Sequence, residues 1–235
     1  MESLSAWFDR ELFGDGGGAG PVVVTVIGSG GKTSLIWRLA RYFACKPRGV
    51  LVTTTTKMFP PPETELLPGI SVAGRLNQQT GKLEALPIEE LAERITAYDL
   101  TLIEGDGSRG LPLKGWTDYE PAVPPFTTIT AGILPLWPLG KPVSAGLIHR
   151  LPLFCALTGA EIGDALKIEH LVKVIAGEKK CLFTAALGRK ILFLNQIEDE
   201  GSASQAEKLA ALLPGDFHAC CGIIAGSVRQ DCIVF

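Results

Sequence analysis

A glycine-rich turn followed by a lysine and two hydroxyl residues is the part of this sequence best suited to chemistry. Residues 28–34 read GSGGKTS. Glycines in such a turn leave backbone N–H groups free to face an anion, the helix N-terminus that follows adds partial positive charge, and Lys32 can reach terminal phosphates. Thr33 carries a hydroxyl that suits Mg²⁺. We therefore predict a nucleotide-phosphate site made by Gly28, Ser29, Gly30, Gly31, Lys32, Thr33 and Ser34.

This turn is shorter than the phosphate-loop pattern G-x-x-x-x-G-K-[ST], because Val26 stands where the first glycine belongs, inside an apolar run. It resembles the shortened loop of Mur-type amide ligases. The alternative is an ordinary glycine turn with a surface lysine. A G-K-T triplet between a strand and a helix rarely occurs without a phosphate to hold, which favours the phosphate site.

Two acids and an arginine follow a second apolar run, in the segment LTLIEGDGSRG. Phosphate-loop enzymes place at such a position the carboxylate that holds Mg²⁺ or activates a nucleophile. The segment resembles the E-G motif of dethiobiotin synthetase and of the molybdopterin-guanine dinucleotide adaptor GTPases. That likeness favours Glu104 as the residue on the metal side and leaves Asp106 as a candidate base. Arg109 can bind a phosphate or a substrate carboxylate with two hydrogen bonds, and a solvated acidic turn with a surface arginine is the alternative.

Two further polar clusters complete the candidate site. Residues 53–56 are four threonines at the end of an apolar run, and we expect Thr54 to complete the Mg²⁺ shell, although threonine is also a common strand residue. The segment NQIE at 195–198 resembles the N-K-x-D motif with which GTPases read guanine. Gln196 and Glu198 depart from that motif, so Asn195 and Glu198 are expected to bind a base without distinguishing ATP from GTP.

Apolar runs alternate with amphipathic segments along the chain. This pattern predicts an α/β fold: a three-layer αβα arrangement around a mostly parallel, doubly wound sheet of the P-loop NTPase type. The polar clusters each follow an apolar strand, so they should meet at the carboxyl edge of the sheet. We expect a β-hairpin inserted near residues 70–86. The expected strands are 22–27, 50–56, 100–103, 127–134, 190–196 and 220–228, and the expected helices include 32–44, 87–98, 168–177 and 202–213.

Length and composition limit the function classes. The 235 residues fit a single domain, 1–235, in which 1–20 form an amphipathic helix and a glycine-rich spacer. A net charge of −3, from 22 basic and 25 acidic residues, argues against nucleic acid as a partner. The longest uncharged stretch, 121–140, holds five prolines, which argues against a membrane helix. Six cysteines without a C-x-x-C motif, together with an N-terminus unlike a secretory signal, indicate a reduced, cytoplasmic setting.

Taken together, GSGGKTS, LVTTTTKM, IEGDGSRGLPLK and FLNQIE resemble the YqeC-type family of selenium-dependent hydroxylase accessory proteins. The likeness covers about residues 20 to 235. Family members more commonly read E-A-D-G-S-R, so Gly105 is a small departure. The resemblance implies a cytoplasmic role in the maturation of molybdenum hydroxylases that carry a labile selenium ligand, through cofactor synthesis or insertion. The implied partners are such a hydroxylase or its cofactor-synthesis proteins.

Three functions are consistent with these motifs. The leading hypothesis is a Mg²⁺-dependent ATP or GTP hydrolase or phosphotransferase serving cofactor maturation, with Lys32, Glu104, Asp106 and Arg109 as its catalytic residues and Thr33, Thr54 and Glu104 near the metal. The second is a Mur-like ligase or kinase that acts on a small acid. The third is a non-catalytic adaptor whose docking depends on bound nucleotide.

Overall fold

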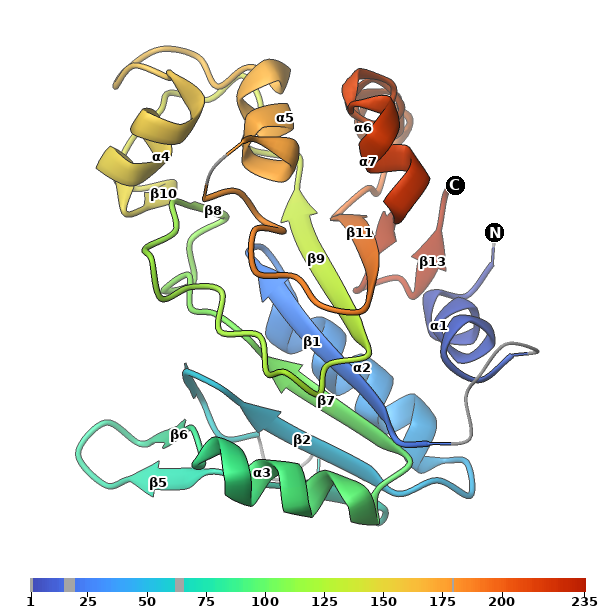
Figure 1. The fold of residues 1–235 in the computed structure, drawn as a ribbon. Helices are drawn as coiled ribbons and strands as arrows, with labels where there is room; N and C mark the ends of the chain where they lie inside the picture. The colour runs from blue at the N-terminus through green and yellow to red at the C-terminus, as the bar shows by residue number, and fades with distance from the viewer. Residues whose placement is uncertain (1, 15–19, 62–65, 179) are drawn as a thin grey trace.

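One mostly parallel β-sheet organises the chain (Figure 1). The computed structural model describes residues 2–14, 20–61, 66–178 and 180–235. Within them, an eight-stranded sheet has the order β13-β12-β11-β9-β1-β7-β2-β4, and only β13 runs antiparallel to its neighbour. These strands are β1 (Val22–Gly28), β2 (Val50–Thr54), β4 (Ile70–Val72), β7 (Leu100–Glu104), β9 (Ile129–Pro135), β11 (Arg189–Asn195), β12 (Cys221–Ser227) and β13 (Cys232–Ile233).

The central strands are buried on both faces, as expected for a parallel sheet covered by helices. Every residue of β1, β2, β7 and β9 is buried. Side chains alternate along β1, so Val22, Val24 and Val26 pack into one core while Val23 packs into another. This alternation explains why the apolar runs are continuous.

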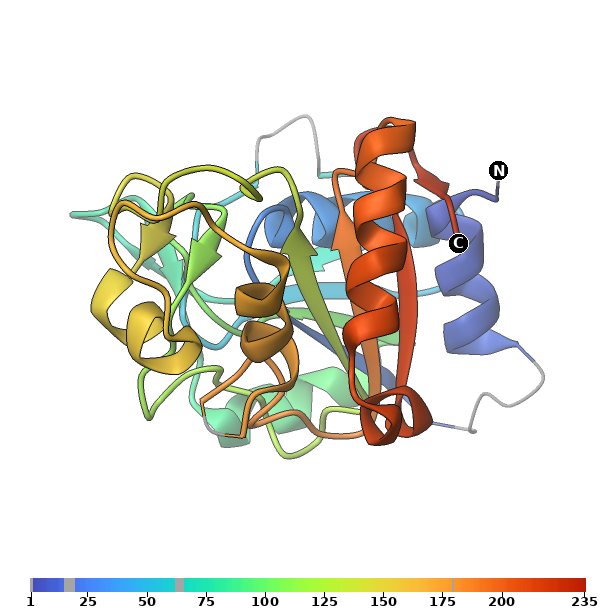
Figure 2. The same ribbon diagram turned by 90° about the horizontal axis from the view of Figure 1, so that it is seen from above.

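Helices α1 (Leu4–Phe13) and α2 (Lys32–Ala44) cover one face of the sheet. Leu4, Phe8 and Leu12 of α1 share the core with Leu35 and Leu39 of α2, all at most 3% exposed. The N-terminal segment also pairs with the C-terminal strand through a bridge from Glu2 to Ile233. Figures 1 and 2 accordingly show the two termini close together.

The opposite face is covered in two parts. Leu91 and Ile95 pack on Leu51 and Ile103, and they belong to α3 (Ile88–Arg94) and the 3-10 turn Ile95–Ala97. A second core lies over β9, β11 and β12. Its helices are α4 (Leu151–Thr158), α5 (Ile168–Ala176), α6 (Glu200–Leu212) and α7 (Gly215–Cys220). The predicted α/β class and three-layer arrangement are therefore confirmed.

The prediction of a hairpin over residues 70–86 was correct only for its second part. Antiparallel strands β5 (Arg75–Asn77) and β6 (Lys82–Glu84) form the hairpin, and β3 (Lys57–Met58) pairs with β6. The first part, Ile70–Val72, instead joins the edge of the main sheet parallel to β2. A three-residue segment carries too little pattern to tell a hairpin arm from an edge strand.

A small insertion lies beyond the carboxyl edge of the sheet. Strand β8 (Leu113–Lys114) pairs in parallel with β10 (Ile148–His149), and α4 follows directly. The expected glycine-rich spacer falls largely on residues 15–19, which lie outside the described residues. Among the helices that the structure describes, none has both the length and the apolarity needed to span a bilayer.

Candidate functional site

The turn between β1 and α2 has the backbone geometry that only glycine adopts easily. Gly28 has φ of 98° and Gly31 has φ of 134°, both outside the range that L side chains favour. A Cβ atom at Gly28 would lie 2.3 Å from the main-chain oxygen of Ile133, and one at Gly31 would lie 2.3 Å from Nδ2 of Asn195. The glycines are therefore required by close packing against β9 and β11 as well as by φ.

The N-terminus of α2 opens at this turn. Gly31 occupies the N-cap position, and no side chain in the described part of the chain caps the helix. The first N–H groups of a helix have no intrahelical acceptor and attract anions. Thr33 is half-buried and Ser34 is exposed, so the helix start faces the solvent at the edge of the sheet.

The prediction that Gly28 leaves its N–H free for an anion was wrong. That N–H donates to both carboxylate oxygens of Asp106, at 3.0 and 3.1 Å. Ser29 is also occupied, because its N–H donates to the oxygen of Ile133 and its hydroxyl donates to the oxygen of Pro112 at 2.7 Å. An anion at this turn would therefore meet the N–H groups that come after Ser29.

Asp106 lies at the centre of a buried charge network. It is 0% exposed. Besides the N–H of Gly28, its oxygens accept from Nζ of Lys114 and Nε1 of Trp116, both at 3.1 Å, and Nζ of Lys32 lies 3.3 Å away. A carboxylate with this many donors is fixed in position, so the geometry favours an anchoring role for Asp106 over the role of a base.

Lys32 points into this network rather than into solvent. Its side chain is only 4% exposed, and its Nζ donates to the oxygen of Gly28 at 2.6 Å. The ammonium group thus lies under the glycine turn, between a main-chain carbonyl and the Asp106 carboxylate. It is positioned to add positive charge at the turn.

The network continues through Lys114 into the insertion. Nζ of Lys114 donates to Glu120 at 2.6 Å, and Glu120 also accepts from the guanidinium of Arg150 at 2.6 and 3.1 Å. Burial by itself would raise the pKa of Glu120, but the hydrogen bonds from Arg150 and Lys114 outweigh it and lower the pKa to about 2. The insertion is therefore tied to the glycine turn by alternating charges.

Glu104 and Thr33 form the second acidic centre. Glu104 ends β7 between the ends of β1 and β2, where it is 6% exposed. Its Oε2 accepts from the hydroxyl of Thr33 at 2.6 Å. Burial raises the pKa of Glu104 above its ordinary value of 4.5 despite the nearby Lys32 and the Thr33 hydrogen bond. An adjacent hydroxyl and carboxylate at the glycine turn are ligands that fit Mg²⁺, which takes few protein ligands and is otherwise bound by phosphate oxygens of a substrate.

The threonine tetrad is engaged by the main chain. Thr53, Thr54 and Thr55 donate to the carbonyl oxygens of Ala73, Glu104 and Ala122, at 2.9, 2.9 and 2.6 Å. Thr54 is 0% exposed, and its hydroxyl also accepts from the N–H of Thr56. These hydroxyls cross-link neighbouring segments, so the Thr54 hydroxyl, although near Glu104, is already engaged by main-chain groups.

Arg109 lies in a different position from the two acids. It is exposed and adopts a φ of 53°, in the left-handed region. His149 lies within its electrostatic range, and burial together with the positive charges of Arg150, Arg109 and Lys114 lowers the pKa of that imidazole. Accessible positive charge is therefore present here, near a histidine whose pKa is lowered.

Asn195 and Glu198 lie across the turn from Glu104. Nδ2 of Asn195 donates to the oxygen of Gly30 at 2.8 Å, and its Oδ1 accepts from the N–H of Val228 at 3.0 Å. Asn195 is 2% exposed, so it holds the glycine turn against β12. Glu198 accepts from the hydroxyl of Ser227 at 2.9 Å and pairs with Arg229.

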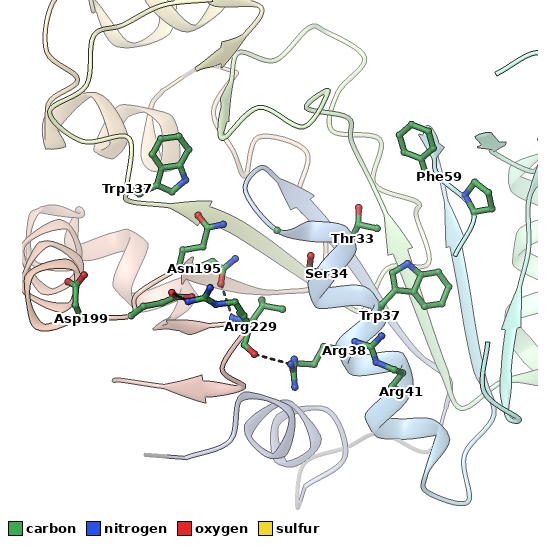
Figure 3. A pocket seen from close by; sticks show the side chains of 15 residues that line it. Thr33, Ser34, Trp37, Arg38, Arg41, Phe59, Trp137, Asn195, Asp199 and Arg229 are labelled. Carbon is green, nitrogen blue, oxygen red and sulfur yellow. Dashed lines mark hydrogen bonds and ion pairs between the residues drawn. The ribbon is translucent and has the colours of Figure 1, made fainter. Parts of the chain in front are cut away.

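A cleft of about 960 Å³ opens beside the glycine turn. Figure 3 shows lining side chains on α2, with Asn195, Asp199 and Arg229 on one side of the helix and Phe59 on the other. Gly31, Thr33 and Ser34 line the cleft, whereas Lys32, Glu104 and Asp106 lie buried below it. The remaining lining residues are Trp37, Arg38, Arg41, Pro60, Trp137, Gln196, Glu198 and Val228.

Two comparisons with known proteins bear on this arrangement. Residues 24–152 match the family model described as "YqeC protein". The chain is also 31% identical, over 220 residues, to an Escherichia coli (strain K12) protein described as "Uncharacterized protein YqeC", covering 85% of this chain and 86% of that protein. The chain belongs to the YqeC family.

The match to the YqeC family model contains the whole buried network, from Lys32 through Asp106 and Lys114 to Arg150. It also contains Gly105, where the resemblance led us to expect alanine. A Cβ atom there would lie 2.7 Å from Cγ2 of Thr25, so this YqeC chain packs β1 closely against the residue that follows β7. The opposite wall of the cleft, formed by residues 195–229, lies beyond the region that the family model matches.

Sequence reasoning missed several residues of this site. Trp116 and Glu120 complete the buried network, and their spacing after Asp106 gave no signal. Arg38 and Arg41 line the cleft and were detectable, because they follow Ser34 by four and seven residues on the exposed face of a predicted helix. Arg229 follows the last long strand and was detectable by the same edge rule that found Asn195.

Proposed function

We propose that the protein binds a nucleoside triphosphate, ATP or GTP, together with Mg²⁺, as a P-loop NTPase-like protein. One observation carries this proposal: a strand-to-helix turn of positive-φ glycines, with an uncapped helix start among the described residues, lies directly beside the Thr33–Glu104 pair. Helix N-termini of this kind bind phosphate, and a hydroxyl with a carboxylate suits the metal that accompanies phosphate.

Each residue has a distinct task in this proposal. The N–H groups that follow Ser29 hold the phosphates, Lys32 neutralises their charge, and Asp106 fixes Lys32 and the turn. Thr33 and Glu104 hold Mg²⁺, which when bound supplies positive charge to the phosphate oxygens. Thr54 supports the main chain of Glu104 in place of a ligand role.

The nucleoside would occupy the part of the cleft between α2 and the end of β11. The amide of Asn195 donates to the glycine turn, and the carboxylate of Glu198 accepts from Ser227 and pairs with Arg229. Contacts with the base therefore come from the accessible groups, Gln196, Asp199 and the half-exposed ring of Trp137. In this set the carboxylate of Asp199 already accepts from the N–H of Ser202 at 2.7 Å, and Gln196 stands where N-K-x-D proteins carry lysine, so the proposal does not choose between ATP and GTP.

The family resemblance supplies the proposed biological setting. We propose an accessory role in maturing selenium-dependent molybdenum hydroxylases in the cytoplasm, with such a hydroxylase or its cofactor-synthesis proteins as partners. Nucleotide hydrolysis or phosphotransfer would accompany cofactor synthesis or insertion. This part rests on the likeness of the motifs alone.

A ligase or kinase acting on a small acid is the second candidate. Arg109 is exposed and within electrostatic range of His149, so it offers positive charge for an acceptor carboxylate. With this function, nucleotide turnover requires an added acid, whereas a hydrolase turns over the nucleotide without one.

A non-catalytic adaptor is the third candidate. Negligible nucleotide turnover combined with nucleotide-dependent capture of a partner would favour it.

Titration calorimetry with ATP and GTP, each with and without Mg²⁺, tests the proposal. Lys32→Met keeps the aliphatic stem and should weaken binding by about 10- to 100-fold, because it removes the positive charge that lies under the turn. Lys208→Met, on the exposed face of α6, should leave binding unchanged. Equal affinity of the wild type and Lys32→Met would rule out this site. If Lys32→Met does not fold, Thr33→Ala should remove the Mg²⁺ dependence instead.

A further inference from the structure

The cleft continues along α2, away from the glycine turn. Its volume of about 960 Å³ lies at the upper end of the range of about 300–1,000 Å³ for small-molecule sites. Phe59, which follows β3, lies on the side of α2 opposite Asp199 (Figure 3), and the adjoining Pro60 also lines the cleft. A second region of the cleft therefore lies between α2 and these two residues.

One face of α2 lines this second region. Ser34, Trp37, Arg38 and Arg41 have the spacing i, i+3, i+4 and i+7 that places side chains in one row along a helix. Arg41 follows Ser34 by seven residues, which corresponds to about 10 Å along the helix axis. Two guanidinium groups thus line the cleft one to two turns beyond the glycine turn. That of Arg38 also donates to the oxygen of Arg229 at 3.2 Å and lies 3.7 Å from Asp231.

Basic side chains slightly outnumber acidic ones in the cleft. Arg38, Arg41 and Arg229 line it, together with Glu198 and Asp199, and Arg229 pairs with Glu198. Two lysines add charge at its rim, because Nζ of Lys82 lies 4.5 Å from the ring centre of Phe59 and Nζ of Lys141 lies 4.4 Å from that of Trp137. The rim lysines therefore make the surroundings of the two rings more basic than the lining itself.

The two rim aromatics are unusually accessible. Phe59 is 65% exposed and Trp137 is 43% exposed. Each ring lies beneath one lysine and lines the cleft. An exposed ring beside cations suits a planar heterocycle that carries an anionic group, because the ring stacks while the cations bind the anion.

We propose that the region of Phe59, Arg38 and Arg41 binds a second phosphorylated ring compound. This inference rests on the proposed function and names a substrate class for the same site. The ligand has a phosphoryl group near Arg41 joined to a planar heterocycle that stacks on Phe59. That chemistry can come from the distal half of one dinucleotide or from a separate mononucleotide. In both cases the two ligand halves meet beside Ser34, at the start of α2.

Diadenosine tetraphosphate, ADP and AMP, each with Mg²⁺, are the probes for a calorimetric test. Wild-type protein should bind diadenosine tetraphosphate at least about tenfold more tightly than ADP, or bind AMP after saturation with ADP. The first result assigns a linked dinucleotide and the second a separate ligand. If the wild type shows neither gain in binding, the inference is wrong, even when ADP itself binds.

Variants separate this inference from the proposed nucleotide site. Arg41→Ala and Phe59→Ala should remove most of the gain while changing ADP affinity by less than about twofold, and Arg41→Lys should recover part of it. Phe59→Ala alters an exposed side chain, so it tests the inference even if Arg41→Ala unfolds. Arg94→Ala on α3 is the matched control. If the gain in binding survives both alanine variants, the inference is wrong. Loss of ADP binding in Lys32→Met tests only the proposed nucleotide site at the glycine turn.

Discussion

The ammonium group of Lys32 lies 3.3 Å from Oδ1 of Asp106, and neither side chain is more than 4% exposed. The same carboxylate accepts from the N–H of Gly28 and from Nζ of Lys114. One buried acid therefore joins the glycine turn, its lysine and the insertion that carries β8. Loss of this acid should affect the fold and the site together.

Asp106→Asn should lower the free energy of unfolding by about 3–5 kcal/mol, because it leaves two buried lysines without their shared carboxylate. Chemical denaturation measures the change. Asp118→Asn is the matched control, since Asp118 is 71% exposed and pairs with Lys180 on the surface, where a pair contributes about 0–1 kcal/mol. A loss below 1 kcal/mol for Asp106→Asn would contradict the central role of this carboxylate.

Gly28→Ala should destabilise the protein more than Gly81→Ala. Both positions have positive φ, and strain alone costs about 1–2 kcal/mol for an L residue. At Gly81 nothing lies within 4 Å of the added Cβ, whereas at Gly28 the Cβ meets a main-chain oxygen at 2.3 Å. Thermal unfolding of the two variants isolates the packing contribution, and equal losses would show that φ alone requires glycine at position 28.

Glu104→Gln should raise the stability of the protein without nucleotide at pH 7. The raised pKa means that the folded state disfavours the ionised carboxylate, so ionisation costs stability as the pH rises through that pKa. Below the ordinary pKa of 4.5 both states are protonated, and the difference from wild type should vanish. Thermal unfolding at pH 7 and below pH 4.5 measures the stability difference between Glu104→Gln and wild type. Glu89→Gln, which changes an exposed side chain, is the control. The same variant should lose Mg²⁺-dependent nucleotide binding.

Glu120→Gln should have the opposite pH profile. The pKa of Glu120 is lowered to about 2, so the ionised carboxylate stabilises the fold above its ordinary pKa of 4.5 and this stability is lost as the pH falls toward 2. We expect a loss of about 1–3 kcal/mol at pH 7, reduced by its partial exposure. Urea denaturation measured over that pH range checks it. A double-mutant cycle with Arg150→Gln should give a coupling of at least about 0.5 kcal/mol.

The adjacent thiols Cys220 and Cys221 should react very differently. Cys220 is exposed, whereas Cys221 is buried and burial raises the pKa of its thiol to about 12. Thiolate is the nucleophile, so iodoacetamide should modify Cys220 and leave Cys221 intact in the folded protein. Peptide mass spectrometry reads both sites. Modification of both thiols at the same rate would contradict the burial of Cys221.

Strand patterns in the sequence were sufficient to predict the layered α/β fold, because parallel strands buried on both faces read as continuous apolar runs. The edge rule was also sufficient to bring Thr33, Glu104 and Asn195 to one rim. The pattern failed for Gly28, whose N–H is taken by Asp106, a residue 78 positions away. Such pairings depend on register and side-chain direction, which no local signal specifies.

The sequence by itself determined the glycine turn, its lysine and the acids that follow β7, because residue type and strand-to-helix context fix their local geometry. Only the tertiary structure decided their tasks. Burial turned Asp106 into an anchor held by two lysines and closed Thr54 off behind the main chain of Glu104. It also gathered arginines from α2 and from the end of β12 around one cleft, since packing in three dimensions sets which charges share a space.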